Sequence, residues 1–229
     1  GGFVVSEKHG DFVKGLTGFD KSLEVVNAGS YPNLFKNKIR KAEETLVLAY
    51  IGQIDKRRDV ESIFRLTRSF SKKNIKHRID VCGSGDLSSK FESLGSEYEH
   101  VKYHGTLSED SLFRVLSEAK VGIMPMPDIP VWRISSTLKL ANYLASGLAV
   151  IGPFHPGNGS KMKGEWNLLS EGNWIEESGK ILSQLTEDDW TAISKSSLES
   201  FESLSWNNIG KKMCKSIEEK ISSFDHSLY

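Results

Sequence analysis

Five short apolar runs alternate with helical patterns between residues 46 and 151, and no other feature of the chain limits its fold as strongly. Runs that are apolar throughout, instead of alternating with polar residues, indicate strands buried on both faces of a sheet. Strands separated by helices pair in parallel through right-handed crossovers. The pattern therefore predicts an α/β fold: a doubly wound, Rossmann-like and mostly parallel sheet with helices on both faces. The predicted strands are Leu46–Ile51, Arg78–Cys82, Val101–His104, Val121–Met124 and Ala149–Ile151.

The first 35 residues do not continue this alternation. Two strand-like runs flank one helical segment, and a polar stretch containing proline follows, as is typical of a linker. We therefore expect residues 1–35 to be the tail of a missing N-terminal domain plus a linker, and residues 36–229 to form the Rossmann-like domain. The segments are Phe3–Val5 (strand), Glu7–Lys14 (helix), Leu23–Val26 (strand) and Tyr31–Glu44 (linker).

The last third of the chain is predicted to be helical, with a final helix from Trp206 to about Ser222. Ile209, Met213 and Ile217 recur on one stripe of that helix. We expect this stripe to be exposed in the isolated chain and to dock on the missing domain.

Charge and composition exclude several classes of protein. The formal net charge is zero, so no overall field draws the chain to nucleic acid or to an anionic membrane, and any anion site must be local. No apolar run is long enough to cross a bilayer, and no signal peptide opens the sequence. Cys82 and Cys214 are isolated, which favours reduced thiols over a disulfide or a zinc site. We expect a cytoplasmic protein without a nucleic-acid partner.

The segment 135–152 carries the clearest sign of a binding site. It predicts a turn, a helix with Lys139 near its start, a stop at Gly147 and a buried strand. A cation at a helix N-terminus beside a strand end is a favourable place for a phosphate group. The alternative is a lysine that is merely on the surface near a helix start.

Other loops follow the predicted strands, where parallel sheets bind their ligands. Gly52 precedes three basic residues, 56–58, which form either an anion site or a solvated basic turn. The loop 83–86 is a tight turn that lacks a complete phosphate-binding motif. A base or sugar can lie against the loop that contains Gly105, Thr106 and Leu107, although His104 is also consistent with a structural role. Two longer loops, Met126–Ser136 and Phe154–Glu165, are further candidates, the second as a flap. No nucleophile elbow, HExxH motif or convincing carboxylate pair is present.

Five segments, taken in order, resemble the C-terminal, donor-binding domain of GT-B glycosyltransferases, above all glycosyltransferase family 4 (group 1). They are LAYIGQIDKRRDVESIF, HRIDVCGSGDL, VKYHGTLSEDSLFRVLSEAKVGIMP, TLKLANYLASGLAVIG and SLSWNNIGKKM, which together extend from about Leu46 to Glu219. VVSEKHGDFVKG and LEVVNAGSYPNLF are similar to the end of the family's N-terminal domain and its crossing into the second domain.

The resemblance assigns roles to individual residues. A basic pair that grips the donor diphosphate falls on Gln53 and Arg58, of which only Arg58 keeps a charge. The two carboxylates of the family's E-x7-E motif fall on Ile134 and Asn142, so both are absent, and Asn142 remains as a neutral ligand for the ribose. Lys139 becomes the main diphosphate ligand. The complete set of predicted site residues is Gly52, Gln53, Arg58 and Lys139 for the diphosphate, Asn142, Ser135 and Ser136 for ribose or sugar, and Gly83, Gly105, Thr106 and Leu107 for the base.

The resemblance implies a hexosyltransferase whose donor substrate is a nucleoside diphosphate sugar and whose acceptor is a glycan or a lipid-linked acceptor. It implies no resident cofactor, and no Asp-x-Asp pair offers a metal site. Because half of the cleft is missing, we expect this chain alone to be inactive and any membrane contact, at the inner face, to come from the missing domain. Two alternatives remain. A sugar-nucleotide epimerase would need carboxylates and histidines that the loops lack, whereas the absent carboxylates favour a non-catalytic module that binds a nucleotide or a glycan.

Overall fold

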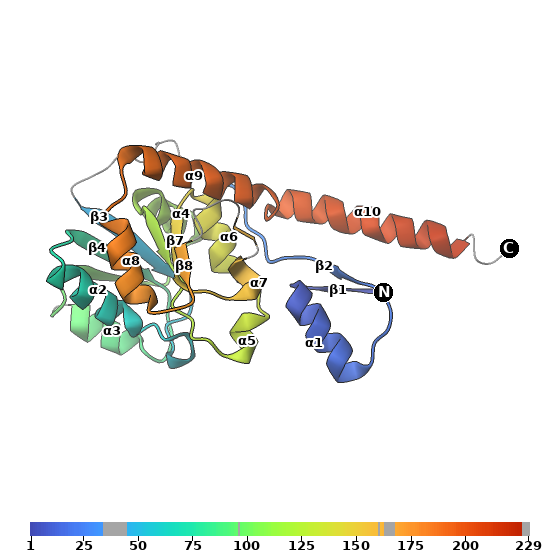
Figure 1. Cartoon of the computed structure of the whole chain (residues 1–229), viewed down its shortest axis with the longest axis horizontal. Coiled ribbons are helices and arrows are strands. Elements are labelled where there is room, and N and C mark those ends of the chain that lie inside the picture. The colour runs from blue at the N-terminus through green and yellow to red at the C-terminus, as the bar shows by residue number, and fades with distance from the viewer. Residues whose placement is uncertain (34–44, 96, 160, 163–167, 226–229) are drawn as a thin grey trace.

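A six-stranded, entirely parallel sheet forms the centre of the computed structural model, which describes residues 1–33, 45–95, 97–159, 161–162 and 168–225 (Figure 1). The strand order is β5-β4-β3-β6-β7-β8. This confirms the predicted doubly wound fold. The strands are β3 (Leu46–Ile51), β4 (His77–Cys82), β5 (Val101–Gly105), β6 (Val121–Ile123), β7 (Ala149–Pro153) and β8 (Leu168–Ser170).

Two hydrophobic cores cover the two faces of the sheet, as uniformly apolar strands require. In β3, Leu48 and Tyr50 face one core, and Val47, Ala49 and Ile51 face the other. The first core contains α2 (Ser62–Lys72), α3 (Ser88–Gly95) and α8 (Trp174–Leu182). The second contains α4 (Glu109–Glu118) and α6 (Leu138–Ala145), and α9 (Glu187–Glu202) contributes to both.

The chain enters the sheet at its middle. From β3 it builds outward to β4 and β5, and then crosses to the other side of β3 to form β6, β7 and β8. The connections that leave β3 and β6 therefore diverge at their carboxyl ends. This is the switch point, where open parallel sheets leave a crevice for ligands.

Local signals explain several helix ends. Ser108 caps α4 by accepting a hydrogen bond from the Ser111 N–H, and two acidic residues follow it in the first turn. Gly147 adopts a φ of 66° directly after α6, as predicted. Leu138 begins α6 and is exposed, because the first turn of the helix borders a pocket instead of the core.

Three short elements were not predicted: α5 (Pro130–Arg133), α7 (Pro156–Gly159) and β8. Each has only three or four residues, too few to show a periodicity. The predicted loop Met126–Ser136 therefore contains a helical turn. Residues 160 and 163–165 of the predicted flap, and residues 34–44 of the predicted linker, lie outside the described residues.

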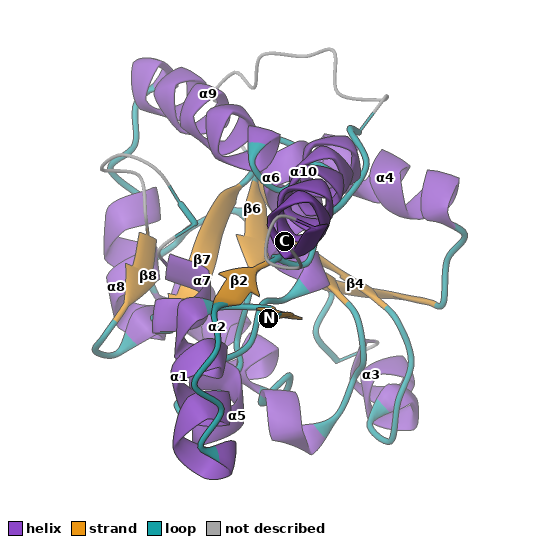
Figure 2. Cartoon of the chain, turned by 90° about the vertical axis from the view of Figure 1, so that its right-hand side faces the viewer, coloured by secondary structure: helices purple, strands orange, loops and turns teal. Residues whose placement is uncertain are grey.

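The N-terminal residues form a small unit of their own. β1 (Gly2–Val4) and β2 (Leu23–Val25) pair in parallel and are joined by α1 (Glu7–Thr17). This unit lies beside the long helix α10 (Trp206–Asp225) in both views (Figures 1 and 2), and the Lys212 Nζ donates to the Val25 carbonyl at 3.0 Å. The predicted domain boundary near residue 35 stays a prediction.

The apolar stripe on α10 is only partly exposed. Ile217 is 44% exposed and Met213 is half-buried, but Ile209 is buried, so its expected exposure is wrong. Ile209 packs against Gly29, where a Cβ atom would lie 2.7 Å from the Ile209 Cδ1 atom. Within the described ranges, no helix is long and apolar enough to cross a membrane.

Candidate functional site

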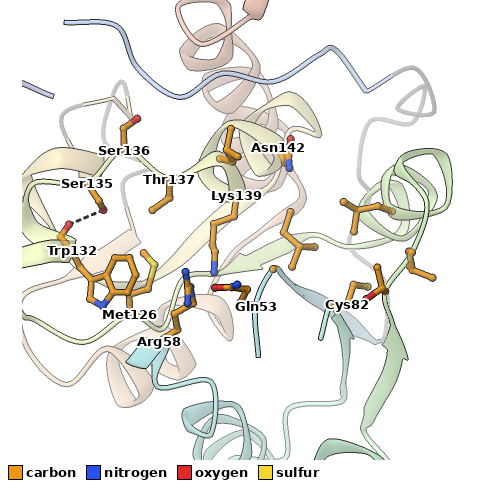
Figure 3. A pocket seen from close by; sticks show the side chains of 17 residues that line it. Gln53, Arg58, Cys82, Met126, Trp132, Ser135, Ser136, Thr137, Lys139 and Asn142 are labelled. Atoms are coloured by element: carbon orange, nitrogen blue, oxygen red, sulfur yellow. Dashed lines mark hydrogen bonds between the residues drawn. The ribbon is translucent and has the colours of Figure 1, made fainter. Parts of the chain in front are cut away.

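A pocket of about 510 Å³ opens at the switch point, beyond the carboxyl ends of β3, β4 and β6 (Figure 3). All of the predicted site residues except Gly105 line it. No Asp or Glu is among the described residues that line the pocket, whereas two cations are. Apolar side chains that the sequence did not single out complete the wall, among them Leu112, Met126 and Trp132.

Lys139 projects into this pocket from the first turn of α6. Its side chain is 8% exposed, and Figure 3 shows its ammonium pointing into the space that Arg58 and Gln53 also face. The Nζ atom donates to the Tyr50 hydroxyl at 3.3 Å and lies 4.3 Å from the centre of the Tyr50 ring. Among the described residues no carboxylate forms an ion pair with it. Burial, followed by repulsion from Arg58, lowers the pKa of Lys139 to about 7.

Arg58 is held in place from two sides. It ends a single 3-10 turn, η1 (Lys56–Arg58), which Asp55 caps, and its guanidinium pairs with the Asp55 carboxylate. The guanidinium also lies 5.1 Å from the centre of the Trp132 ring. The Trp132 Nε1–H donates to the Arg57 carbonyl at 3.2 Å, which ties α5 to the turn. Lys56 and Arg57 are exposed and do not line the pocket, so the expectation that all three basic residues reach one anion is wrong.

Glycines let two loops meet at the floor of the pocket. Gly52 and Gly83 have φ values of 120° and 139°, which other residues rarely adopt. A Cβ atom on Gly83 would lie 1.9 Å from the Gly52 carbonyl oxygen. The Gly52 N–H donates to the Cys82 carbonyl at 2.9 Å, so the expected amide contact from Gly52 to a diphosphate is wrong. The requirement for glycine at this position comes from its φ of 120°, since a Cβ atom there would meet the Lys139 Nζ only at an ordinary contact distance of 3.6 Å.

The N-terminus of α6 supplies the free amides that Gly52 does not. The N–H groups of Leu138 and Lys139 have no hydrogen-bond partner within the part of the chain that the structure describes, and both residues line the pocket. The N-cap residue Thr137 makes no capping bond to the helix, and its own N–H and hydroxyl donate to the Asn158 Oδ1. The positive end of α6 therefore faces the same space as the two cations.

Contacts with the N-terminal segment occupy part of the predicted ribose and sugar site. The Ser30 hydroxyl donates to the Asn142 Oδ1. One of the two lone pairs of the Asn142 Oδ1 is therefore already used, which leaves one acceptor site and the amide N–H groups for a ribose. The Ser136 hydroxyl accepts a hydrogen bond from the Ala28 N–H at 2.9 Å, and the Ser135 hydroxyl donates to the Trp132 carbonyl at 3.0 Å.

The predicted base side is apolar and backbone-lined. Thr106 and Leu107 line it, whereas Gly105 stands behind it and accepts the Gly83 N–H at 2.7 Å. His104 has the structural role that the sequence left open, because its Nε2 lies 2.7 Å from the buried carboxylate of Asp80. Cys82 is buried and free, and burial raises its pKa to about 12.

Sequence reasoning missed two aromatic residues at the site. Trp132 follows a proline-rich loop, where an exposed aromatic residue is itself a sign of binding, but its contact with Arg58 crosses from one loop to another. Tyr50 lies within an apolar strand, where nothing in the sequence distinguishes it from a core residue. In the described portion, no cluster of three or more His, Cys, Asp or Glu residues is placed to hold a metal ion.

No protein-family model matches the sequence, and no curated protein matches it either. Solved structures resemble it in fold. The pneumococcal O-GlcNAc transferase GtfA, in complex with UDP and GlcNAc, is 16% identical with a TM-score of 0.68, over 95% of this chain and 44% of its own. HepE (Alr3699) from Anabaena, in complex with UDP and glucose, is 10% identical with a TM-score of 0.70, over 95% of this chain and 62% of its own. WaaG, a glycosyltransferase involved in lipopolysaccharide biosynthesis, is 14% identical with a TM-score of 0.65, over 88% of this chain and 60% of its own.

The likeness establishes a fold: the chain has the Rossmann-like fold of the C-terminal domain of GT-B glycosyltransferases, in agreement with the resemblance seen in the sequence. The chain spans less than two thirds of the length of each of these three proteins.

Proposed function

We propose that this chain, whose fold is that of the C-terminal domain of GT-B glycosyltransferases, binds a nucleoside diphosphate sugar in the pocket at the switch point. The complete protein would transfer that sugar to a glycan or a lipid-linked acceptor. One observation carries the proposal: the buried Lys139, with which no described carboxylate forms an ion pair, shares a pocket with Arg58 and the open N-terminus of α6.

This arrangement suits a leaving group that gains negative charge. As the bond to the sugar breaks, charge develops on the diphosphate, and fixed donors that already point at it stabilise the transition state. Lys139 is well suited to this role because it is shielded from water, where an ion pair is stronger than at the surface. Arg58 contributes less, since Asp55 already neutralises part of its charge.

The acceptor side is proposed to come from the rest of the protein. Phe12 and Leu16 on α1 are 53% and 73% exposed, and Ile217 and Ile221 on α10 are 44% and 59% exposed. Apolar side chains exposed on two neighbouring elements favour burial against further protein. We propose that this further part holds the acceptor, provides any contact with the inner face of a membrane, and is needed for activity.

A second candidate is a module that binds a nucleotide or a glycan without catalysis. It is favoured by Ile134, which places an apolar side chain where the family resemblance implies a carboxylate, and by Asn142, whose Oδ1 already accepts a hydrogen bond from Ser30. An epimerase receives no support, because no Asp or Glu lines the described pocket. Sugar transfer by the two-domain protein would identify the enzyme, and nucleotide binding without transfer would identify the module.

Calorimetric titration with UDP, GDP, ADP and CMP, with a thermal-shift screen of their sugar conjugates, tests the binding step. We expect Lys139→Met to weaken nucleoside diphosphate binding by about tenfold, the value of one charge-assisted contact. Arg58→Met should weaken it by about fivefold. Arg57→Met is the matched control, because Arg57 lies on the same turn but outside the pocket, and it should change nothing. Unchanged affinity in Lys139→Met would refute the proposed diphosphate site.

A further inference from the structure

The loop 135–137, on one side of the pocket, is surrounded by hydrogen-bond donors that lack acceptors. The Lys161 Nζ donates to the Ser136 Oγ at 2.6 Å, and the described structure offers it no other partner. An ammonium group has three N–H bonds, so two of them remain unused. Its single acceptor is a neutral hydroxyl, and among the described residues no carboxylate forms an ion pair with it.

Two neighbouring side chains also have hydrogen-bond donors without acceptors. The Ser136 Oγ already accepts from Lys161 and from the Ala28 N–H, so its own proton is free to be donated. The Asn158 side chain is fully buried and accepts two hydrogen bonds from Thr137 through Oδ1, while its Nδ2 has no partner. Asn27, adjacent to Ala28, has an unpaired Oδ1, which is neutral and does not supply the missing negative charge.

Hydrogen-bond donors that lack acceptors raise the free energy of the folded chain when no ligand is bound. A buried donor without an acceptor loses its hydration and gains nothing in return, and a partly buried cation loses more. Burial alone lowers the pKa of Lys161 to about 8, so the amine still carries its charge at neutral pH. A group with a negative charge and two acceptor atoms would satisfy the Lys161 ammonium and the Ser136 hydroxyl together.

The position of the set identifies which part of a ligand it would meet. Ser136 lines the pocket, and the Lys161 Nζ lies one hydrogen bond behind it. Lys139, on the helix that begins directly after this loop, faces the proposed diphosphate. Ser136 therefore borders a separate part of the same pocket, next to the diphosphate site, and Lys161 lies directly behind it.

We infer that the sugar of the nucleotide donor is a hexuronic acid, whose carboxylate is bound by the Lys161 ammonium and the Ser136 hydroxyl while Lys139 and Arg58 bind the diphosphate. The inference rests on the function proposed above. It adds an acidic sugar as the substrate class, and it gives Lys161 the role of a specificity-determining residue.

A matched pair of ligands tests the inference. The nucleoside diphosphate that binds the chain most tightly fixes the base. For UDP the pair is then UDP-glucose and UDP-glucuronate, which differ only in a CH₂OH or a carboxylate at C6. We expect the glucuronate conjugate to bind the unmodified chain about tenfold more tightly than the glucose conjugate, as one charge-assisted contact predicts. For GDP the equivalent pair is the mannose and mannuronate conjugates.

Lys161→Gln should bring the two affinities to within about twofold of each other and leave the affinity for the nucleoside diphosphate alone unchanged. Lys161→Arg keeps the charge and should retain the preference. Equal or weaker binding of the uronate conjugate by the unmodified chain would overturn the inference, and this comparison needs no variant to fold. If nucleoside diphosphates bind but the uronate is not preferred, only the inference fails. If no nucleoside diphosphate binds, the proposed function fails with it.

Discussion

The two walls of the pocket are built in different ways. The inner wall, formed by Ile51, Gly52 and Lys139, belongs to the end of β3 and the first turn of α6, and it continues into the buried core. The outer wall, formed by Trp132, Ser135 and Ser136, belongs to α5 and the loop that follows it. Partners distant in the sequence hold this outer wall, namely the Arg57 carbonyl, the Ala28 N–H and Lys161.

This difference between the two walls indicates which part of the site is fixed by the packing of the sheet and its helices. Lys139 is buried and its ammonium contacts the Tyr50 ring and hydroxyl, so the position of the inner wall depends on the packing of the sheet and of α6. The outer wall depends on a few hydrogen bonds between surface segments, each of modest net strength. We therefore expect substitutions in the inner wall to change stability and affinity strongly, and substitutions in the outer wall to adjust affinity or specificity.

The largest effect on stability and binding is expected from Gly83→Ala, because Gly83 packs against Gly52 directly beneath the inner wall. The new Cβ atom would collide with the Gly52 carbonyl and would occupy a φ of 139°. We expect a loss of about 3 kcal/mol or more in the free energy of unfolding, measured by urea denaturation, together with a loss of nucleotide binding.

Two other glycines separate strain from collision. Gly105 has a φ of 66° but open space around its Cα, so Gly105→Ala should cost about 1 kcal/mol. Gly15 lies in α1 with open space, so Gly15→Ala should stabilise the chain by up to about 1 kcal/mol. If Gly83→Ala were no worse than Gly105→Ala, the close approach of the two loops would not matter.

The second effect concerns the charge of Lys139. Its pKa of about 7 means that above pH 7 the amine must take up a proton when a diphosphate binds. Affinity for the nucleoside diphosphate alone should therefore fall as pH rises from 7 to 9, and the total fall should approach the loss of about tenfold expected for Lys139→Met. Titration calorimetry at pH 7, 8 and 9 measures this dependence. Lys139→Arg stays protonated and should give a much flatter profile, and an equally steep one in this variant would show that Lys139 is not the titrating group.

As pH rises, the contribution of Lys139 to the free energy of unfolding should increase, whereas nucleotide affinity should fall. Its folded pKa lies below the unfolded value near 10.5, so the unfolded chain binds more protons between pH 7 and 10.5. The contribution of Lys139 to the free energy of unfolding therefore rises with pH across that window. Urea titrations of the native chain and of Lys139→Met across these pH values should show a steeper rise in the native chain.

A smaller effect is expected at the outer wall. Trp132→Leu removes both the ring beneath Arg58 and the hydrogen bond to the Arg57 carbonyl. We expect nucleoside diphosphate binding to weaken by about threefold, because Arg58 loses its fixed position but keeps its charge. Trp132→Phe keeps an aromatic ring and should lose less. A tenfold loss in Trp132→Leu would mean that the outer wall contributes as much as the inner one.

The smallest change in affinity is expected from Ser30→Ala. It removes the hydrogen bond to the Asn142 Oδ1 and should lower the free energy of unfolding by about 1 kcal/mol. Nucleotide affinity should change by less than about twofold, because the inner wall is untouched. Ser117→Ala, on the exposed side of α4, is the matched control and should be neutral within about 0.5 kcal/mol. A large loss of affinity in Ser30→Ala would show that Asn142 contacts the nucleotide.

The sequence by itself determined the sheet, the order in which strands and helices alternate, and most of the residues that line the pocket. These follow from local patterns: apolar runs make strands, Ser108 and Gly147 mark helix ends, and loops after parallel strands gather at one edge of the sheet. Lys139 could be singled out because its place at the start of α6 depends only on neighbours within one turn.

Only the tertiary structure decided which of these groups are free to bind a ligand. Nothing in the sequence showed that the Gly52 N–H donates to the Cys82 carbonyl, or that the Ser30 hydroxyl donates to the Asn142 Oδ1. Nor did it show that Lys161 lies behind Ser136 without an ion-pair partner among the described residues. A hydrogen-bonding group accepts the partner that packing brings to it, and here several of those partners are more than 100 residues away. Residue patterns predict where a site forms, and long-range packing decides which of its donors and charges remain available.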